Sequence, residues 1–469
     1  MNEDRSDRYL IVGAGPAGLA VMRSFLAAGI PFDAVESHTG VGGIWDLEAP
    51  DSPMYESAHF ISSKQWSAYS DFPFPDEYPD YPSHSQILEY VRAYADHHDL
   101  VRHIEFATTV VKAQPAPDRG WTVELRGGER RRYRGLVACP GFQRVPNLPT
   151  VSGQFDGELL HSRDYRSMSV FKGRRAMVVG AGNSGVDIAC DAAIVAERAY
   201  ISMRRGHWIF PKHVRGIPID YWGLDEVSDQ QQLAAWLEEI VGDVTRLGLP
   251  KPDHLPLTLH PIINSQILHY LSHGDLTYKP QVERFDGSTA HFTDGSSVEL
   301  DVIVFATGYV DVVPFIAPEY LQIANDPESD LFFLTFHRNR SDVFVNGLAN
   351  LNASGYYDLN AAADLIANHI ALETAGDPRF AELRQIIEHE CPDLTSGFTY
   401  EDRAGHGEYV NSHAATRYAE QLISRLDLQP YSFPSTDLTP GARWPIPDIS
   451  PTIVAGSAST QSIDRTSSR

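Results

Sequence analysis

Two glycine-rich turns, at residues 13–18 and 180–185, carry the chemistry that the sequence predicts most directly. The first reads Gly13-Ala14-Gly15-Pro16-Ala17-Gly18, and the second reads Gly180-Ala181-Gly182-Asn183-Ser184-Gly185. Both fit the pattern G-x-G-x-x-G, in which glycine permits a tight turn and lets backbone N–H groups approach a pyrophosphate at a helix N-terminus. One such match is a weak signal. Two in one chain predict that two dinucleotides are held at once, which is the arrangement needed to pass electrons between them.

Each turn lies between an expected strand and an expected helix. Residues 9–12 form an apolar run that is typical of a buried parallel strand, and residues 17–28 are expected to form the helix after the first turn. Around the second turn, we expect a strand at 176–179 and a helix at 184–195. The sequence therefore predicts an α/β fold with two doubly wound, Rossmann-like dinucleotide-binding domains.

The residue after the second strand of each unit indicates which dinucleotide fits. In the first unit this residue is Glu36, whose carboxylate can accept hydrogen bonds from ribose hydroxyls and would repel a 2′-phosphate. In the second unit the same place carries Arg204 and Arg205. Arginine accommodates a 2′-phosphate through paired N–H donors, although a solvated strand end is the alternative interpretation. We therefore predict FAD at the first turn and NADPH at the second.

The composition is that of an ordinary globular protein. The chain has 469 residues, with 62 Asp and Glu against 38 Lys and Arg, and a formal net charge of -24. This charge argues against nucleic acid or an anionic membrane as a partner. Because the sequence shows neither a secretory signal nor an apolar run near the ~20 residues that cross a bilayer, we expect a cytoplasmic protein.

Neither a metal site nor a redox dithiol is indicated. The cysteines, Cys139, Cys190 and Cys391, are far apart and form no C-x-x-C, so we expect all three to be buried small apolar residues. His254 and His260 lack the i, i+4 spacing of a helical zinc pair.

The positions of the turns predict the domain organisation. We expect residues 1–168 to be the first part of the FAD-binding domain, 169–308 to be the NADPH-binding domain, and 309–440 to be the returning part of the first domain. The FAD domain is then discontinuous. Residues 441–469 are rich in Pro, Ser and Thr and are expected to form a poorly ordered tail.

Residues 155–165 read F-x-G-x-x-x-H-x-x-x-Y, and further motifs lie at 42–45, 69–75 and 305–309. Together with the two glycine turns, these motifs resemble those of the flavin-containing monooxygenases, the class B flavoprotein monooxygenases that use FAD and NADPH. The related Baeyer–Villiger enzymes usually carry Trp where this chain has Tyr165, which favours the branch that oxidises amines and sulfides.

This resemblance implies a reaction. NADPH reduces the flavin, O2 adds to its C4a carbon, and the resulting C4a-hydroperoxyflavin gives one oxygen atom to a soft nucleophile, an amine or a sulfide. The expected partners are a small-molecule substrate and O2, and a homodimer is one possible assembly. Baeyer–Villiger oxidation of a ketone, an uncoupled NADPH oxidase that releases H2O2, and a non-catalytic redox sensor are the alternatives. The substrate has no local signature, because such a pocket is assembled from loops.

The resemblance also implies the site residues. Where the family places a hydrogen-bonding Asn this chain has Ile61, which cannot donate, with His59, Ser62 and Ser63 as substitute donors nearby. Ile61 and Ser62 are taken as catalytic positions together with His161 of the signature, for which a structural role between the domains has equal weight. No metal is expected. The predicted cofactor contacts are Gly13, Gly15, Pro16, Ala17, Gly18, Glu36, Gly43, Trp45, Val110, Gly180, Gly182, Asn183, Ser184, Gly185, Arg204, Arg205, Thr307 and Gly308.

Overall fold

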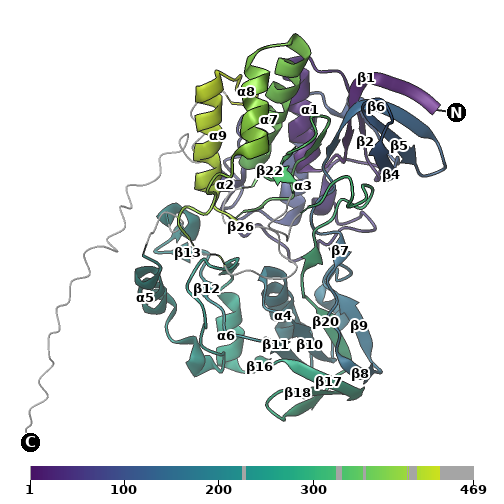
Figure 1. Ribbon diagram of the computed structural model, residues 1–469. Helices are drawn as coiled ribbons and strands as arrows, with labels where there is room; N and C mark the ends of the chain where they lie inside the picture. The colour runs from purple at the N-terminus through teal and green to yellow at the C-terminus, as the bar shows by residue number, and fades with distance from the viewer. Residues whose placement is uncertain are drawn as a thin grey trace, which may run out of the picture.

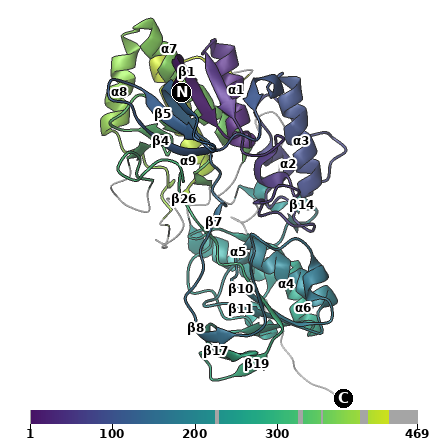
Figure 2. The ribbon, with the colours of Figure 1, turned by 90° about the vertical axis from the view of Figure 1, so that its right-hand side faces the viewer.

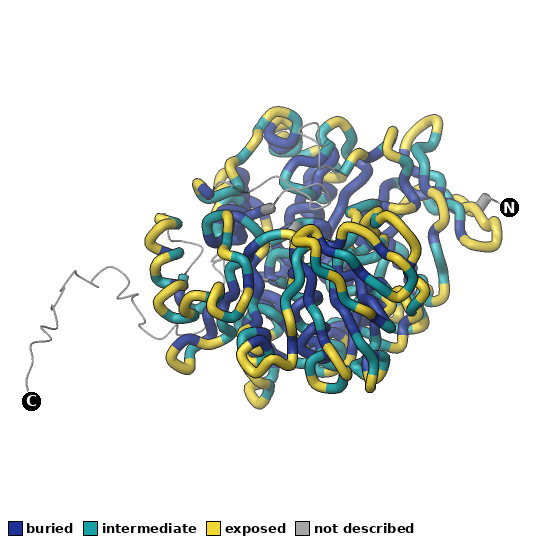
Figure 3. Tube along the Cα trace, turned by 90° about the horizontal axis from the view of Figure 1, so that it is seen from below, coloured by how far each residue is buried: buried dark blue, intermediate teal, exposed yellow. Residues whose placement is uncertain are grey.

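The computed structural model describes residues 2–223, 229–323, 330–351, 355–398, 400 and 409–433. These residues form two units, each built on its own largely parallel sheet, which confirms the predicted α/β fold (Figure 1). Buried residues lie mainly inside the molecule and exposed residues mainly in the loops at its edge (Figure 3). The tail expected at 441–469 lies outside the described residues.

The first unit begins with the predicted strand, glycine turn and helix. The strand β1 (Asn2–Val12) pairs in parallel with β2 (Phe32–Val35) on one side and with β6 (Arg130–Ala138) on the other. Leu10 and Ile11 are fully buried, because both faces of this sheet are covered. The sheet order is β22-β23-β24-β6-β1-β2-β3, with β4 and β5 joined through β6. The other strands of this sheet are β3 (Ile104–Glu105), β4 (Val110–Pro115), β5 (Trp121–Leu125), β22 (Leu331–Phe332), β23 (Phe336–His337) and β24 (Val343–Val345).

Helices from both ends of the chain pack beside this sheet. The helix α1 (Pro16–Ala28) contacts α7 (Tyr356–Ala375), which comes from the far end of the sequence (Figures 1 and 2). The strand β24 pairs in parallel with β6, with Val343 opposite Leu136. The chain therefore returns to the first sheet after the second unit. The remaining helices of this unit are α2 (Lys64–Ser67), α3 (His84–His97), α8 (Arg379–His389) and α9 (Ser412–Leu426).

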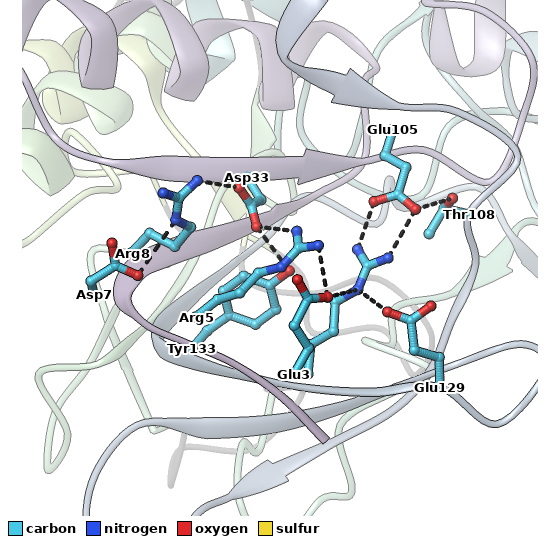
Figure 4. Close-up of polar contacts among 10 residues, drawn as sticks. Glu3, Arg5, Asp7, Arg8, Asp33, Glu105, Thr108, Glu129 and Tyr133 are labelled. Carbon is cyan, nitrogen blue, oxygen red and sulfur yellow. Dashed lines mark hydrogen bonds and ion pairs between the residues drawn. The ribbon is translucent and has the colours of Figure 1, made fainter. Parts of the chain in front are cut away.

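The strand β1 starts seven residues earlier than the apolar run at Tyr9 predicts, since Asn2 to Asp4 pair with Arg130 to Arg132 of β6. Ion pairs, rather than the burial of apolar side chains, stabilise this N-terminal extension of β1. Arg131 has a buried side chain that binds both oxygens of Glu105, at 2.6 and 2.9 Å, and reaches Glu129 at 2.6 Å. Arg5 and Arg8 share Asp33 at the start of β2 (Figure 4). Charged residues in this pattern carry no period-2 apolar signal, so the sequence did not reveal the extension.

The second unit repeats the strand, turn and helix arrangement. The strand β10 (Arg175–Val179) leads into α4 (Asn183–Val195), and β11 (Arg198–Ser202) follows. The parallel sheet has the order β16-β11-β10-β20-β9, with β16 (Leu276–Lys279), β20 (Val302–Phe305) and β9 (Glu158–His161). A smaller sheet contains β8 (Ser152–Phe155), β17 (Val282–Gly287), β18 (Thr289–Phe292) and β19 (Ser297–Glu299), and the helices are α5 (Gln230–Val241) and α6 (Gln266–His273).

Two chain segments connect the units. The strand β7 (Val145–Pro146) pairs antiparallel with β21 (Tyr309–Val310), so the outgoing and returning links run side by side. The boundary predicted at residue 168 puts β8 and β9 in the first unit, whereas their hydrogen bonds join them to the second. The domain limits drawn from the sequence otherwise remain a prediction.

Cys139 and Cys190 are buried, but Cys391 is exposed, so the expectation that all three cysteines are buried is wrong for Cys391. Cys391 lies two residues beyond the end of α8. Among the residues that the structure describes, every helix is too short or too polar to span a bilayer.

Candidate functional site

The first glycine turn is shaped by close backbone packing. Gly13 has φ +112°, and a Cβ there would lie 2.4 Å from the carbonyl oxygen of Cys139. A Cβ on Gly18 would lie 1.9 Å from the carbonyl oxygen of Gly13, so helix α1 can start against the turn only with glycine at this place. Gly15 is the N-cap of α1 and faces Gly43, and a Cβ on Gly15 would lie 3.2 Å from the Gly43 Cα.

Glu36 closes this turn from the end of β2. One carboxylate oxygen accepts the N–H of Ala14 at 2.7 Å, and the other accepts the N–H of His38 and the hydroxyl of Ser37, both at 2.9 Å. The side chain is 6% exposed. Each carboxylate oxygen has two lone pairs, so Glu36 can still accept a hydroxyl from a bound ligand. The predicted acid therefore also holds its own turn in shape.

The second turn has the same architecture with one difference. Gly180 has φ +121°, and its Cβ would lie 2.2 Å from the Ala306 carbonyl oxygen; a Cβ on Gly185 would lie 2.4 Å from the Gly180 carbonyl oxygen. At Gly182, the N-cap of α4, a Cβ would meet no atom within 4 Å. The start of α4 thus faces open space, where backbone N–H groups can meet an anion.

Arg204 and Arg205 differ in what surrounds them. Arg204 is exposed and lines the cavity described below. Arg205 also lines it, but its Nε and Nη2 lie 2.6 and 2.5 Å from one carboxylate oxygen of Asp253. The same phosphate-binding role is predicted for both arginines from the sequence, whereas in the structure Arg205 forms an ion pair with Asp253.

One cavity of about 2150 Å³ runs between the two units and is lined by both turns. This volume is about twice the upper end of ordinary pockets for one small molecule, which is roughly 1,000 Å³. It therefore has room for two dinucleotides. Of the predicted cofactor and catalytic residues, those that line it are Gly13, Gly15, Pro16, Ala17, Glu36, Gly43, Trp45, Ile61, Ser62, Val110, Gly180, Gly182, Asn183, Ser184, Gly185, Arg204, Arg205, Thr307 and Gly308.

Gly18 and His161 are not among the residues that line this cavity. Gly18 acts through packing, as described above. His161 is 4% exposed at the end of β9. Its Nε2 lies 3.1 Å from the Gly308 carbonyl oxygen, which can only accept, and its Nδ1 accepts the N–H of Arg163 at 3.1 Å. Both ring nitrogens are thus engaged, and burial lowers the pKa of His161. The arrangement suits the structural role that the sequence left open.

Ile61 and Ser62 lie in the loop between Phe60 and α2. The Ser62 hydroxyl lies 2.7 Å from the hydroxyl of Ser67, which in turn donates to the Ser63 carbonyl oxygen. The Ser63 N–H is bound by Asp220 of the second unit at 2.6 Å. Trp45 packs edge-on against Phe60 with ring centroids 5.0 Å apart. The loop is therefore anchored from both units, with an apolar side chain at residue 61.

Several residues near the cavity were not predicted. His38, Asp51 and Arg144 line it and form one chain of contacts, with His38 Nε2 2.7 Å and Arg144 Nη2 2.5 Å from the Asp51 carboxylate. Asp51 raises the pKa of His38. These residues come from three separate loops, so their types and spacing carried no signal.

The helix α4 also brings a carboxylate into the cavity. Asp187 accepts the Asn264 side-chain N–H at 2.5 Å and the Tyr55 hydroxyl at 3.1 Å. Burial raises the pKa of Asp187. The sequence signal that could have identified Asp187 is an acid between apolar residues, in a helix that directly follows a glycine turn. Asn183, predicted as a cofactor contact, binds the backbone at Pro261 and Ile263 and so shapes the wall of the cavity.

Comparison with known proteins places these features in one family. Residues 6–354 match the model of the family described as flavin-binding monooxygenase-like. Flavin-containing monooxygenase 5 of Oryctolagus cuniculus is 33% identical over 345 residues, which cover 68% of this chain and 64% of that protein. Flavin-containing monooxygenase 1 of Homo sapiens is 30% identical over 370 residues, covering 73% and 69%. The chain thus spans a little under two thirds of the length of the first of these relatives.

Solved structures share the fold at lower identity. Cyclohexanone monooxygenase from Rhodococcus sp. Phi1, bound to NADP+, has a TM-score of 0.69 at 17% identity, covering 91% of this chain and 98% of that one. S-allyl-L-cysteine S-oxygenase from Allium sativum has a TM-score of 0.60 at 17% identity, covering 92% and 89%. The residues matched by the family model include both glycine turns, and both turns line the same cavity. The chain belongs to the flavin-binding monooxygenase-like family.

Proposed function

We propose that this chain is an NADPH-dependent FAD monooxygenase that transfers one oxygen atom of O2 to a soft nucleophile, an amine or a sulfide. The observation that carries this proposal is the cavity that both glycine turns line, with Ile61 and Ser62 in its wall. Family membership and the NADP+ bound to a solved relative support the pair of cofactors. Bound FAD would supply the redox chemistry by accepting a hydride from NADPH and activating O2.

The residues of each turn fit the cofactor assigned to it. At the first turn, the backbone N–H groups at the start of α1 can meet a pyrophosphate, and Glu36 can accept a ribose hydroxyl. At the second turn, the open space at Gly182 suits the pyrophosphate of NADPH. Arg204 is exposed at the cavity and can bind the 2′-phosphate.

The cavity wall near Ile61 suits a reaction that water would spoil. Trp45 and Phe60 are 9% and 8% exposed and pack together there. Apolar walls exclude water from a reactive centre, and orientation then comes from the bound cofactors.

The decisive experiment supplies the purified protein with NADPH, O2 and a panel of amines, sulfides and ketones. We expect N- or S-oxygenated product in proportion to the NADPH consumed. Esters from ketones would replace this proposal with Baeyer–Villiger oxidation. Protein that binds FAD yet consumes no NADPH with any compound would contradict it and favour a redox sensor.

Ile61 favours a second candidate function, an NADPH oxidase that releases H2O2. With an apolar side chain at residue 61, a polar atom of the flavin site has no donor from this position, and an unpaired buried polar group costs about 1–3 kcal/mol. We expect Ile61→Asn to raise the ratio of oxygenated product to H2O2, and Ile61→Val, the apolar control, to leave it unchanged. An unchanged ratio in Ile61→Asn would show that another group already serves the flavin.

A further inference from the structure

The helix α4 presents two carboxylates to the first unit. Asp187 accepts the Tyr55 hydroxyl at 3.1 Å, and Asp191 accepts the Ser57 hydroxyl at 2.5 Å. Residues four apart lie on the same face of a helix. The turn at residues 55–57 therefore meets α4 at two points, one helical turn apart. A backbone bond beside them, from the Glu56 N–H to the Arg166 carbonyl oxygen at 2.9 Å, closes the contact.

Each carboxylate is oriented by residues on its own side of the contact. The Tyr165 hydroxyl, at the end of the family signature, donates to the same oxygen of Asp191 at 2.8 Å. The Asn264 amide donates to Asp187 at 2.5 Å. Tyr165 and Asp191 are 1% and 5% exposed. An ionised carboxylate only accepts, so hydroxyl groups must point their hydrogens at it, and such charge-assisted bonds are strong.

The position of α4 decides where the coenzyme sits. Its first residue, Asn183, directly follows Gly182, the turn glycine that faces open space. A shift of α4 against the first unit would move that turn, and with it the nicotinamide, relative to the flavin. Misplacement by about 1 Å can slow a reaction on the order of 10²-fold.

We propose that Asp187 and Asp191 are positioning residues: by receiving the Tyr55 and Ser57 hydroxyls, they set the placement of the NADPH turn against the FAD-binding unit for hydride transfer. The inference deepens the proposed function and rests on it. Neither carboxylate exchanges a proton or contacts the reacting atoms in this role. Asp191 also joins two residues that are distant in sequence, since Ser57 and the Tyr165 of the signature both donate to it.

The test removes the hydroxyls and keeps the carboxylates, in the variant Tyr55→Phe/Ser57→Ala. The matched control is Tyr418→Phe, which removes a hydroxyl that donates to Glu390 at 2.8 Å. Tyr418 lies on α9 in the first unit and does not line the cavity. In the FAD-loaded protein we expect the limiting rate of flavin reduction by NADPH to fall at least about tenfold in the double variant. The Kd for NADP+ should stay within about twofold, because Gly182 and Arg204 are untouched. The control should match the wild type in both.

The conservative variant at the carboxylate provides a rescue. Asp191→Asn keeps an oxygen that accepts both hydroxyls and should retain most of the reduction rate, whereas Asp191→Ala should behave like the double variant. A rate that falls only in proportion to NADP+ affinity, or equal rates in all variants, would overturn the proposal.

Small-angle X-ray scattering of the FAD-loaded proteins without NADPH separates this proposal from the proposed function. We expect a larger radius of gyration in Tyr55→Phe/Ser57→Ala than in the wild type and the control. If NADPH fails to reduce the wild type, the proposed function falls, and identical scattering of all variants would then also remove the contact's positioning role.

Discussion

In both glycine turns the first and last glycines make the same kind of backbone contact, whereas the middle glycines differ in their surroundings. In both, the first glycine has a positive φ and lies against a carbonyl oxygen, that of Cys139 or Ala306. In both, the last glycine lies against the carbonyl oxygen of the first. These contacts are backbone on backbone, so they bring strand and helix together whatever ligand is bound.

The surroundings of the middle glycine distinguish the two sites. Gly15 is covered by Gly43, whereas Gly182 faces open space. The strand ends differ in the same sense, because Glu36 is buried and bonded to its own turn while Arg204 is exposed. The enclosed turn suits a resident cofactor and the open one suits a coenzyme that exchanges, as the proposed function requires.

The largest effect should come from the last glycine of each turn. A Cβ in Gly18→Ala or Gly185→Ala would lie 1.9 or 2.4 Å from a backbone oxygen, which cannot move without separating helix from strand. We expect each variant to lose about 3 kcal/mol or more of unfolding free energy. Chemical denaturation of both variants measures this, with Gly40→Ala as the control, because Gly40 also lacks a positive φ but has open space around a Cβ. A normal Gly18→Ala would mean that the two turns do not share this requirement.

The strand-end arginines should come next. Arg204→Ala is expected to lose some ten- to a hundredfold of the preference for NADP+ over NAD+, the worth of a charged phosphate contact of about 1.5–3 kcal/mol. Arg205→Ala should lose less, because Asp253 already holds that guanidinium. Asp253→Asn should increase the preference. Equilibrium titration with NADP+ and NAD+ checks all three, and equal losses in the two arginine variants would show that Asp253 yields to the phosphate.

Acid should destabilise the first unit through a buried histidine. His369 of α7 is fully buried among Phe336, Phe344 and Phe380, and its ring nitrogens have no hydrogen-bond partner among the described residues. Burial, helped by Arg384, lowers the pKa of His369 from 6.5 to about 3. The unfolded chain therefore binds a proton that the folded one refuses, so stability is complete above pH 6.5 and falls as the pH drops toward 3.

At pH 5 this difference corresponds to about 2 kcal/mol of unfolding free energy. His369→Leu should remove that part of the acid sensitivity, while His273→Leu, an exposed position of the second unit, should leave it unchanged. Denaturation at pH 5 and 7.5 gives the comparison. Equal pH dependence of wild type and His369→Leu would show that the histidine is protonated in the folded protein.

The smallest effect on folding should come from the middle glycines, where the ligand effect is informative. Gly182→Ala has ordinary dihedral angles and free space, so we expect stability unchanged or raised by about 0.4–1 kcal/mol, with weaker NADP+ binding. Gly15→Ala should weaken folding slightly through Gly43 and reduce FAD retention. Melting temperature, FAD content and NADP+ titration check the pair. Undiminished NADP+ binding by Gly182→Ala would place the pyrophosphate elsewhere.

Local pattern was sufficient for the parts of this protein that repeat. Both turns, the strands at residues 9–12 and 176–179, and the helices after them were predictable, because glycine spacing and apolar runs are local signals. The extension of β1 to Asn2 and the membership of β8 and β9 in the second unit were not, since ion pairs and strand partners distant in sequence decide them.

The amino-acid sequence by itself determined that two dinucleotide-binding units exist, and that one ends its second strand with an acid and the other with arginines. Only the tertiary structure decided that Gly15 is covered and Gly182 is open, that Asp253 holds Arg205, and that Tyr55, Ser57 and Tyr165 reach the carboxylates of α4. The reason is physical: backbone conformation and burial follow periodic patterns along the chain, whereas these contacts depend on how separate loops meet in space.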